Sequence, residues 1–198
     1  MPEKLPDLFK AIIAASRKSD TKKAEAGLWK RFGTRCAMLV LDSTGFTRST
    51  RKKGIIHFLR LFLNMQKLVV PVFKRHRCLA WRGSADNLFA EFATPDEAFA
   101  AAIDAQRAVK KAGLRLDART PYRICIGIGY GEVLDAGDQG VFGSEMNLAC
   151  KLGEDTAGGG ETLLSENAYK HLSDSKGPSF KKKHTIQSGN KIAYYQAR

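Results

Sequence analysis

The sequence lacks the features of a membrane-spanning or disulfide-bonded protein. No apolar run reaches the roughly 18 residues that a bilayer-spanning helix needs. Segment 1–20 is too interrupted by charge to predict a signal peptide. Four cysteines stand singly in apolar segments, without C-x-x-C spacing, and predict neither a zinc site nor a disulfide framework: Cys36, Cys78, Cys125 and Cys150. These absences predict a cytoplasmic protein with no membrane contact.

Zinc-finger and RNA-recognition signatures are also missing, although the 198 residues carry a formal net charge of +13. The basic residues are dispersed, with short runs at 51–53 and 181–183. Charge alone does not choose between a nucleoside triphosphate and a nucleic acid. Because no nucleic-acid motif accompanies it, nucleic acid is the less favoured partner.

Residues 1–33 predict an N-terminal helical arm that precedes a domain at 34–198. Apolar residues recur at helical spacing over 5–13, a charged stretch follows, and Leu28, Trp29 and Phe32 supply an apolar anchor before Gly33. We interpret this region as a packing or dimer arm.

From Thr34 the pattern predicts an α+β domain with the ferredoxin-like order β-α-β-β-α-β. The expected core elements are a strand at 34–41, a helix at 55–73, strands at 78–81 and 88–92 around a turn at 83–87, a helix at 95–111 and a strand at 122–128. A helix at 144–152, a glycine loop at 158–160, a strand at 162–164, a helix at 166–172 and a C-terminal hairpin complete the expected order.

Two carboxylates are expected to meet at one edge of this sheet. Asp42 ends the first strand and precedes a turn through Thr47, whose backbone N–H groups suit phosphate. Asp86 lies in the hairpin turn, beside the end of that strand in this topology. Two such carboxylates can hold two metals. The plainer alternative is that Asp42 caps a turn and Asp86 is an ordinary hairpin aspartate.

The alternating glycines of 127–131 are a weak sign of a dinucleotide loop. The segment lacks the G-x-G-x-x-G spacing, and residues 141–143 intervene before any predicted helix.

Five blocks of the sequence, in order, resemble the catalytic domain of class III nucleotidyl cyclases. They are 40–47 (D-x-x-G-F-T in the family), 85–92 (G-D-x-x-x-A-x-F), 123–133 (R-x-G-I-H-x-G-x-V), 141–152 (V-F-G-x-x-V-N-x-A-x-R-L) and 160–165 (G-x-I-L-V-S). The resemblance covers about residues 34–195. It implies that family's ferredoxin-like core and a lyase that closes a nucleoside triphosphate into its 3′,5′-cyclic monophosphate and pyrophosphate.

The resemblance also implies the metal and phosphate ligands. Two divalent cations, Mn²⁺ or Mg²⁺, would be held by Asp42 and Asp86, with the Ser43 carbonyl as a further metal ligand. The backbone N–H groups of Gly45, Phe46 and Thr47 would hold the phosphates, and Arg123 matches the arginine of the family that contacts the triphosphate.

A second set of catalytic residues is implied on the helix at 144–152. Asn147 and Lys151 are four residues apart and therefore share one helix face. In the family the equivalent asparagine orients the ribose and an arginine stabilises charge on the reacting phosphate, both delivered by the other subunit. A homodimer with active sites at its interface is therefore implied.

The sequence departs from the family at several of these positions. Lys151 replaces arginine, so bidentate phosphate contact is lost although the charge remains. The later phosphate-binding lysine of the family falls near Ser188, and Lys191 or the run at 181–183 could replace it. Arg82 and Gly140 occupy the base-reading positions and match neither the adenine code nor the guanine code.

Arg82 and Gly140 together resemble the stand-alone pyrimidine cyclases of bacterial anti-phage defence, which make cyclic UMP or cyclic CMP as second messengers. Arg82 offers only donors, which suit the acceptors of uracil or cytosine, or O6 and N7 of guanine. We therefore favour UTP as substrate, with CTP next. A conventional adenylate or guanylate cyclase and a non-catalytic nucleotide-binding module stay open.

Overall fold

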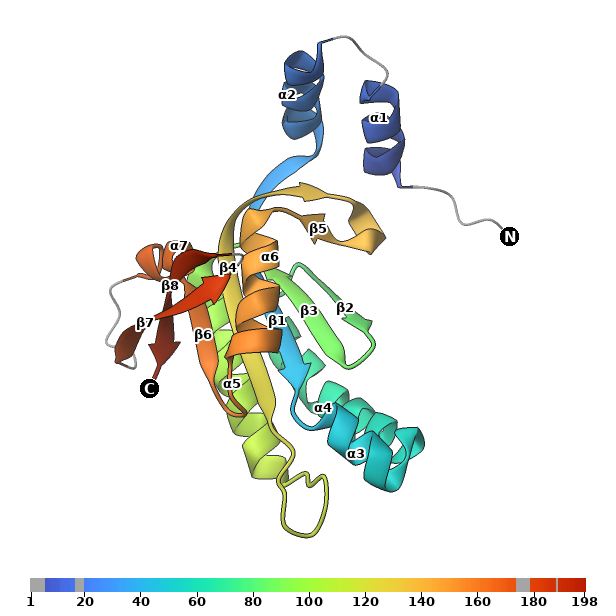
Figure 1. Cartoon of the computed structure of the whole chain (residues 1–198), viewed down its shortest axis with the longest axis vertical. Helices are drawn as coiled ribbons and strands as arrows, with labels where there is room; N and C mark the ends of the chain where they lie inside the picture. The colour runs from blue at the N-terminus through green and yellow to red at the C-terminus, as the bar shows by residue number, and fades with distance from the viewer. Residues whose placement is uncertain (1–5, 17–19, 174–178, 188) are drawn as a thin grey trace.

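The computed structural model describes residues 6–16, 20–173, 179–187 and 189–198 (Figure 1). In these ranges an eight-stranded, mostly antiparallel sheet runs in the order β2-β3-β1-β4-β6-β8-β7, with β5 paired to β4. The strands are β1 (Gly33–Ser43), β2 (Ala80–Ser84), β3 (Asn87–Phe92), β4 (Ile124–Asp135), β5 (Val141–Phe142), β6 (Thr162–Ser165), β7 (Phe180–Gln187) and β8 (Asn190–Ala197). The α-helices are α1 (Asp7–Ala15), α2 (Thr21–Phe32), α3 (Phe46–Lys53), α4 (Ile55–Arg75), α5 (Pro95–Ala112), α6 (Ser144–Cys150) and α7 (Glu166–Lys170). The α+β fold with a helical arm and a C-terminal hairpin is thus confirmed.

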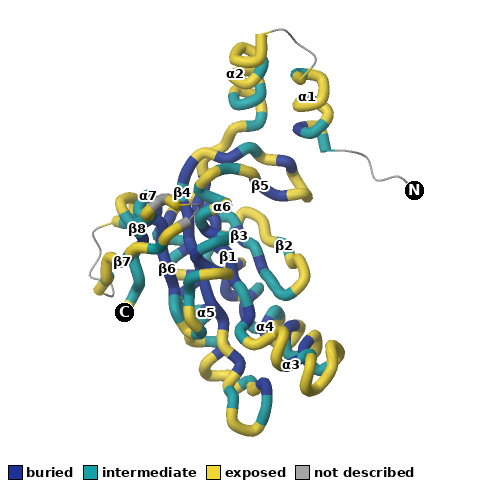
Figure 2. Tube along the Cα trace, viewed as in Figure 1, coloured by how far each residue is buried: buried dark blue, intermediate teal, exposed yellow. Residues whose placement is uncertain are grey.

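The central strand β1 is buried on both faces, which explains its unbroken apolar run. Ala37, Leu39 and Leu41 join the core under α4 and α5. The alternate residues Cys36, Met38 and Val40 join a second core cluster under α6. Because strand side chains alternate between faces, a continuous apolar run is what a strand covered on both sides requires. Figure 2 shows this buried centre and the more exposed arm.

The alternating glycines of β4 allow α6 to approach the sheet closely. A Cβ added to Gly127 would lie 2.2 Å from the Ala149 carbonyl oxygen, and one added to Gly129 would lie 2.4 Å from that of Glu145. Gly153 plays the same part from the other side, because its Cβ would lie 2.8 Å from the Val40 carbonyl oxygen. These glycines serve helix packing, which accounts for the absence of dinucleotide-loop spacing.

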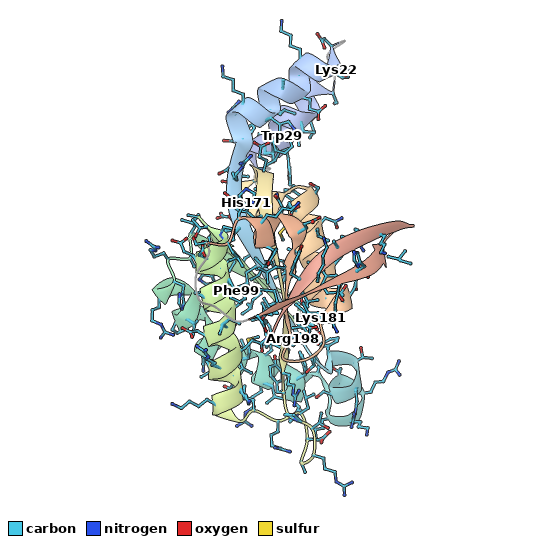
Figure 3. The ribbon with its side chains drawn as sticks, turned by 90° about the vertical axis from the view of Figure 1, so that its left-hand side faces the viewer. Lys22, Trp29, Phe99, His171, Lys181 and Arg198 are labelled. Carbon is cyan, nitrogen blue, oxygen red and sulfur yellow. The ribbon has the colours of Figure 1, made fainter. Side chains whose placement is uncertain are left out.

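The helical arm contacts the domain at its two ends. Figure 3 shows Trp29 at the end of α2 nearer the sheet and Lys22 at the far end. On α1, Leu8 is buried, and the ring of Phe9 meets that of Phe142 edge-on with centroids 5.6 Å apart.

One helix in the described part of the chain, α4, is long and apolar enough to cross a membrane by length and composition. Its inner face carries six buried residues, which pack into the core: Phe58, Phe62, Met65, Val69, Val72 and Phe73. A core helix passes the same test of length and composition, so α4 gives little reason to expect a membrane span.

Several expected boundaries are wrong. The first two residues of α3 were expected in a turn and the rest of this helix was not predicted, and β2 lies two to three residues later than the strand expected at 78–81. The strand expected at 122–128 continues to Asp135, and the helix expected to reach Leu152 changes at Lys151 into a π-helix, Lys151–Thr156. β2 is an edge strand with little burial, so its sequence carries weak alternation.

Candidate active site

The ends of β1 and of the β2–β3 hairpin meet at one edge of the sheet. β1 pairs antiparallel with β3, with Leu41 opposite Leu88, so the residues after Leu41 run alongside the hairpin turn. The Ser43 hydroxyl donates a hydrogen bond to the Asp86 carbonyl oxygen at 3.3 Å. Asp42 and Asp86, separated by 44 positions in the sequence, are thereby brought to the same edge.

The carboxylate of Asp42 sits in surroundings that disfavour its charge. Burial, together with the nearby carboxylates of Asp86, Glu154 and Asp155, raises the pKa of Asp42 to about 6, although the hydrogen bond from the Ser43 N–H acts to lower it. Burial, Asp155 and Asp86 also raise the pKa of Glu154. Oxygen ligands with unneutralised charge are what Mg²⁺ and Mn²⁺ prefer, so this donor set fits a divalent cation.

Ser43 itself is buried and bridges three parts of the edge. Its hydroxyl lies 2.5 Å from the Tyr122 hydroxyl, in addition to its bond to Asp86. Over the residues that the structure describes, no three His, Cys, Asp or Glu side chains lie close enough to hold an ion by themselves. A cation at Asp42 and Asp86 would therefore need further oxygens, from backbone, water or a bound phosphate.

The turn that follows is the start of α3. Gly45 has φ +83°, a left-handed conformation that favours glycine, and its backbone precedes the helix. Phe46 and Thr47 are thus helical, which corrects the expected turn at these two positions. The first N–H groups of a helix lack intrahelical acceptors, so Gly45, Phe46 and Thr47 still present donors beside Asp42.

Arg123 lies next to this edge through its backbone. The Thr44 N–H donates to the Arg123 carbonyl oxygen at 3.0 Å. The Arg123 side chain instead turns to the glycine loop, where Nη1 donates to the Gly159 carbonyl oxygen at 3.3 Å.

Arg82 and Gly140, the two positions expected to read the base, are in direct contact. A Cβ added to Gly140 would lie 2.1 Å from the Arg82 Cζ, so the guanidinium rests on the Gly140 backbone. Arg82 Nη1 also donates to Glu91 Oε1 at 2.7 Å, and its Cζ lies 5.4 Å from the Phe89 ring centroid. The contact with Gly140, the ion pair with Glu91 and the ring of Phe89 hold this arginine in place.

Arg82 and Asn147 line one cleft of about 490 Å³, together with Ser84, Phe89 and Met146. Neither Asp42 nor Asp86 lines it. The single chain therefore does not bring Asn147 into one cavity with the acidic edge, the edge of the sheet that carries Asp42 and Asp86.

Comparison with solved structures identifies the fold. An adenylate/guanylate cyclase/hydrolase from Silicibacter pomeroyi matches with a TM-score of 0.72 and 21% identity over 83% of this chain and 96% of that one. The adenylyl cyclase CyaB from P. aeruginosa matches at TM-score 0.66 and 20% identity, over 84% and 95% of the two chains. The fold is that of a nucleotide cyclase catalytic domain. The guanylate cyclase domain of RhGC from Catenaria anguillulae, in complex with GTP, matches at TM-score 0.69 and 16% identity, over 83% and 96%. No protein-family model matches the sequence, and no significant match exists among curated proteins.

Within this cyclase fold, Lys151 begins the π-helix and lies near the acids of its own chain. Its Nζ is 3.7 Å from Asp155 Oδ2, in an i,i+4 pair. The expected α-helical i,i+4 relation of Asn147 and Lys151 spans the junction of α6 and the π-helix. The position near Ser188 lies outside the described residues. Of the lysines proposed to replace it, Lys182 is engaged with Glu166 at 3.3 Å.

Sequence reasoning missed Glu154 and Glu91. Glu154 accepts a hydrogen bond from the Asn87 side chain at 3.0 Å, which joins the π-helix to the hairpin that carries Asp86. Glu91 is an acid on the strand β3, and its side chain pairs with Arg82. A signal was available for Glu91, since a strand residue faces the same side as residues two positions away, here Phe89.

Proposed function

We propose that this protein is a metal-dependent nucleotide cyclase that converts UTP, or next CTP, into its 3′,5′-cyclic monophosphate and pyrophosphate. The convergence of Asp42 and Asp86 beside the start of α3 carries the proposal. It supplies paired carboxylates for cations and free backbone donors for phosphates at the same edge. The cyclase fold adds an independent reason to expect this chemistry.

The residues of this chain have distinct tasks in such a reaction. Asp42 and Asp86, with the Ser43 carbonyl, would hold two divalent cations, which when bound supply activation of the ribose 3′-hydroxyl and neutralisation of the leaving pyrophosphate. Gly45, Phe46 and Thr47 would orient the triphosphate through their N–H groups. The Arg123 guanidinium would pair with the phosphates after releasing the Gly159 carbonyl oxygen.

Base selection is assigned to Arg82 and Gly140. The guanidinium shares one N–H with Glu91 and borders the cleft that Asn147 lines. It presents donors, whereas the amino group of adenine needs an acceptor, and Gly140 has no side chain to supply one. The arginine side chain also reduces the room in the cleft, which favours a pyrimidine over a purine.

The active form is proposed to be a homodimer. Asn147 and the acidic edge lie in separate places on one chain, so a partner would supply Asn147 and Lys151 to complete the site. Mixing Asp42→Ala chains with Asn147→Ala chains tests this point. Activity in the mixture, from two inactive parents, supports the dimer, and an inactive mixture that is shown to exchange subunits contradicts it.

The test of the reaction is incubation of the purified protein with UTP, CTP, ATP or GTP and Mn²⁺ or Mg²⁺, with cyclic products measured by mass spectrometry. We expect cyclic UMP to form fastest, and Asp42→Ala to abolish turnover while the exposed-acid control Glu25→Gln retains it. A folded protein that yields no cyclic product from any nucleotide would end the proposal.

Metal binding can be measured without turnover. We expect Mn²⁺ with a non-hydrolysable nucleotide to raise the thermal midpoint of the wild type and of Glu25→Gln, but not of Asp42→Asn. Ligand binding to the native state stabilises it by mass action, so an equal rise in Asp42→Asn would place the ions elsewhere.

Two alternatives are separated by the same assays. Preference for ATP or GTP would identify a purine cyclase whose cleft tolerates Arg82. Metal-dependent nucleotide binding without turnover would identify a non-catalytic module, which the lysine at position 151 favours because a single ammonium lacks the fork of arginine. A cytoplasmic location and a second-messenger role in anti-phage defence stay part of the proposal and depend on a cyclic pyrimidine product.

A further inference from the structure

A second cleft, of about 560 Å³, lies between the end of α5, the connection at 113–123 and the glycine loop at 158–160. Its apolar lining comes from Val109, Leu114, Tyr122 and Ile124. A volume of this size with an apolar floor and a few polar groups is typical of small-molecule sites.

The rim of this cleft is strongly basic. Four cations line it, Arg107, Lys110, Arg115 and Arg123, against one carboxylate, Glu161. The Glu161 carboxylate is already occupied, since it accepts from the Gly158 N–H at 2.8 Å and from the Gln196 amide at 2.6 Å.

Much of this positive charge is not neutralised within the protein. Arg107 pairs with Asp104 at 3.2 Å, whereas Lys110, Arg115 and Arg123 form no ion pair with any residue that the structure describes. The Gln106 amide, by contrast, is satisfied, because it donates to the carbonyl oxygens of Ile124 and Glu161. The unpaired positive charge of the cleft therefore favours a negatively charged ligand.

The floor of the cleft is bonded directly to the acidic edge. Tyr122 lies in hydrogen-bond contact with Ser43, and the backbone of Arg123 accepts from Thr44. Both contacts fall within two residues of Asp42, so a ligand that moves Tyr122 or Arg123 acts on the segment that ends β1.

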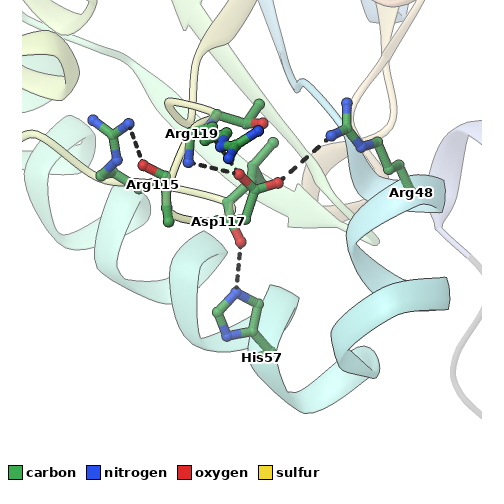
Figure 4. A network of polar contacts seen from close by, with 8 residues as sticks. Arg48, His57, Arg115, Asp117 and Arg119 are labelled. Carbon is green, nitrogen blue, oxygen red and sulfur yellow. Dashed lines mark hydrogen bonds and ion pairs between the residues drawn. The ribbon is translucent and has the colours of Figure 1, made fainter.

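The connection that forms one wall is also anchored to α3 and α4, as Figure 4 shows. Arg48 pairs with Asp117 at 3.7 Å, and His57 Nε2 lies 3.1 Å from the Leu116 carbonyl oxygen. The Leu116 side chain also fills the space beside Gly45, where an added Cβ would lie 2.5 Å from it. The wall of the cleft thus touches Gly45, at the start of the segment 45–47 that is proposed to bind the phosphates.

We propose that this cleft is a regulatory site for a small ligand that combines an apolar ring with a phosphate or carboxylate group. The ring lies on the apolar floor, and the anion pairs with Lys110 and Arg115. A bound ligand moves Tyr122 and the backbone of Arg123, and thereby changes the rate of the reaction at Asp42 and Asp86. The regulatory part rests on the proposed cyclase function, whereas the binding part does not.

Binding is tested by isothermal titration of the metal-free protein with phenyl phosphate, benzoate and benzyl alcohol. We expect phenyl phosphate or benzoate to bind and uncharged benzyl alcohol not to. The double variant Lys110→Glu/Arg115→Glu, checked for an unchanged thermal midpoint, should bind at least tenfold more weakly, and the exposed-lysine control Lys67→Glu should bind like the wild type. Equal affinity in the double variant, or no binding of either anion, overturns the proposal.

Two further measurements separate this site from the catalytic one. Saturating Mn²⁺ and a non-hydrolysable nucleotide should leave phenyl phosphate binding in place, and loss of binding under these conditions would move the ligand to the turn at 45–47 and overturn the second site. The ligand should change the initial rate at saturating nucleotide in the wild type and not in Lys110→Glu/Arg115→Glu. If the protein proves inactive, the same comparison is made on the midpoint shift caused by Mn²⁺ and nucleotide. An equal effect in both proteins overturns the regulatory part.

Discussion

Replacing Gly140 with alanine is expected to destabilise the protein by displacing the Arg82 guanidinium. Gly140 has φ +88° and ψ −161°, a region open essentially to glycine alone, so alanine there costs about 1–3 kcal/mol of backbone strain. The added methyl would also meet Arg82 Cζ, Nη2 and Nε within 2.5 Å. The guanidinium must then leave Glu91.

The free-energy cost of losing the ion pair between Arg82 and Glu91 can be estimated from the burial of the two side chains. The side chains of Arg82 and Glu91 are 25% and 15% exposed, so separating them leaves a largely desolvated carboxylate without its partner. Such a group costs about 1–3 kcal/mol, which together with the strain gives an expected loss of about 2–6 kcal/mol in the free energy of unfolding.

A double-mutant cycle isolates the contact. Urea denaturation is measured for the wild type, Gly140→Ala, Arg82→Ala and the double variant. Once Arg82 is truncated, the new methyl meets no guanidinium, so Gly140→Ala should then cost only the backbone strain. We expect a coupling energy of about 1 kcal/mol or more. Costs that add to within about 0.5 kcal/mol would show that Arg82 does not rest on Gly140, and the reasoning would fail.

Three further predictions concern stability, each measured by chemical denaturation. Gly127→Ala should lower the free energy of unfolding by about 3 kcal/mol, because its methyl would meet backbone atoms of α6 that cannot move aside. Gly27→Ala, in open space on α2, should raise the free energy of unfolding by about 0.5–1 kcal/mol. Similar effects of the two variants would refute close packing of α6. Ala85→Gly should gain about 0.5–1 kcal/mol, because Ala85 has φ +53° in the hairpin turn, and a loss would contradict the strain. The hydrogen bond from His76 lowers the pKa of Asp104 below its ordinary value of 3.8. The stability gap between wild type and Asp104→Asn should therefore be present at pH 6 and shrink as the pH falls below that value, and a gap that widens in acid would refute the assignment.

Local patterns were sufficient for much of the fold. The unbroken apolar run that ends at Leu41 predicted the strand β1, and the helix predicted from residue 95 does begin at Pro95, where Thr94 caps α5 through its hydroxyl. These signals survive in the sequence because neighbours along the chain create them. The edge strand β2 and the short helix α3 carry no such pattern, so their boundaries were missed.

For the candidate site, the sequence likewise predicted some features and left others to be tested. The identities and order of Asp42, Asp86, Arg82 and Gly140 were readable as motif positions, and the predicted topology already brought the two aspartates together. Their metal and base-reading roles are predictions that the proposed assays test.

The sequence by itself determined the order of the core strands and helices and the residue types available for chemistry. Tertiary structure alone decided that Glu91 holds Arg82 against Gly140, that Glu154 joins the hairpin of Asp86, and that the glycines of β4 seat α6. The physical reason is that these contacts form between segments far apart in the chain, where each partner's local pattern is that of an ordinary strand or helix.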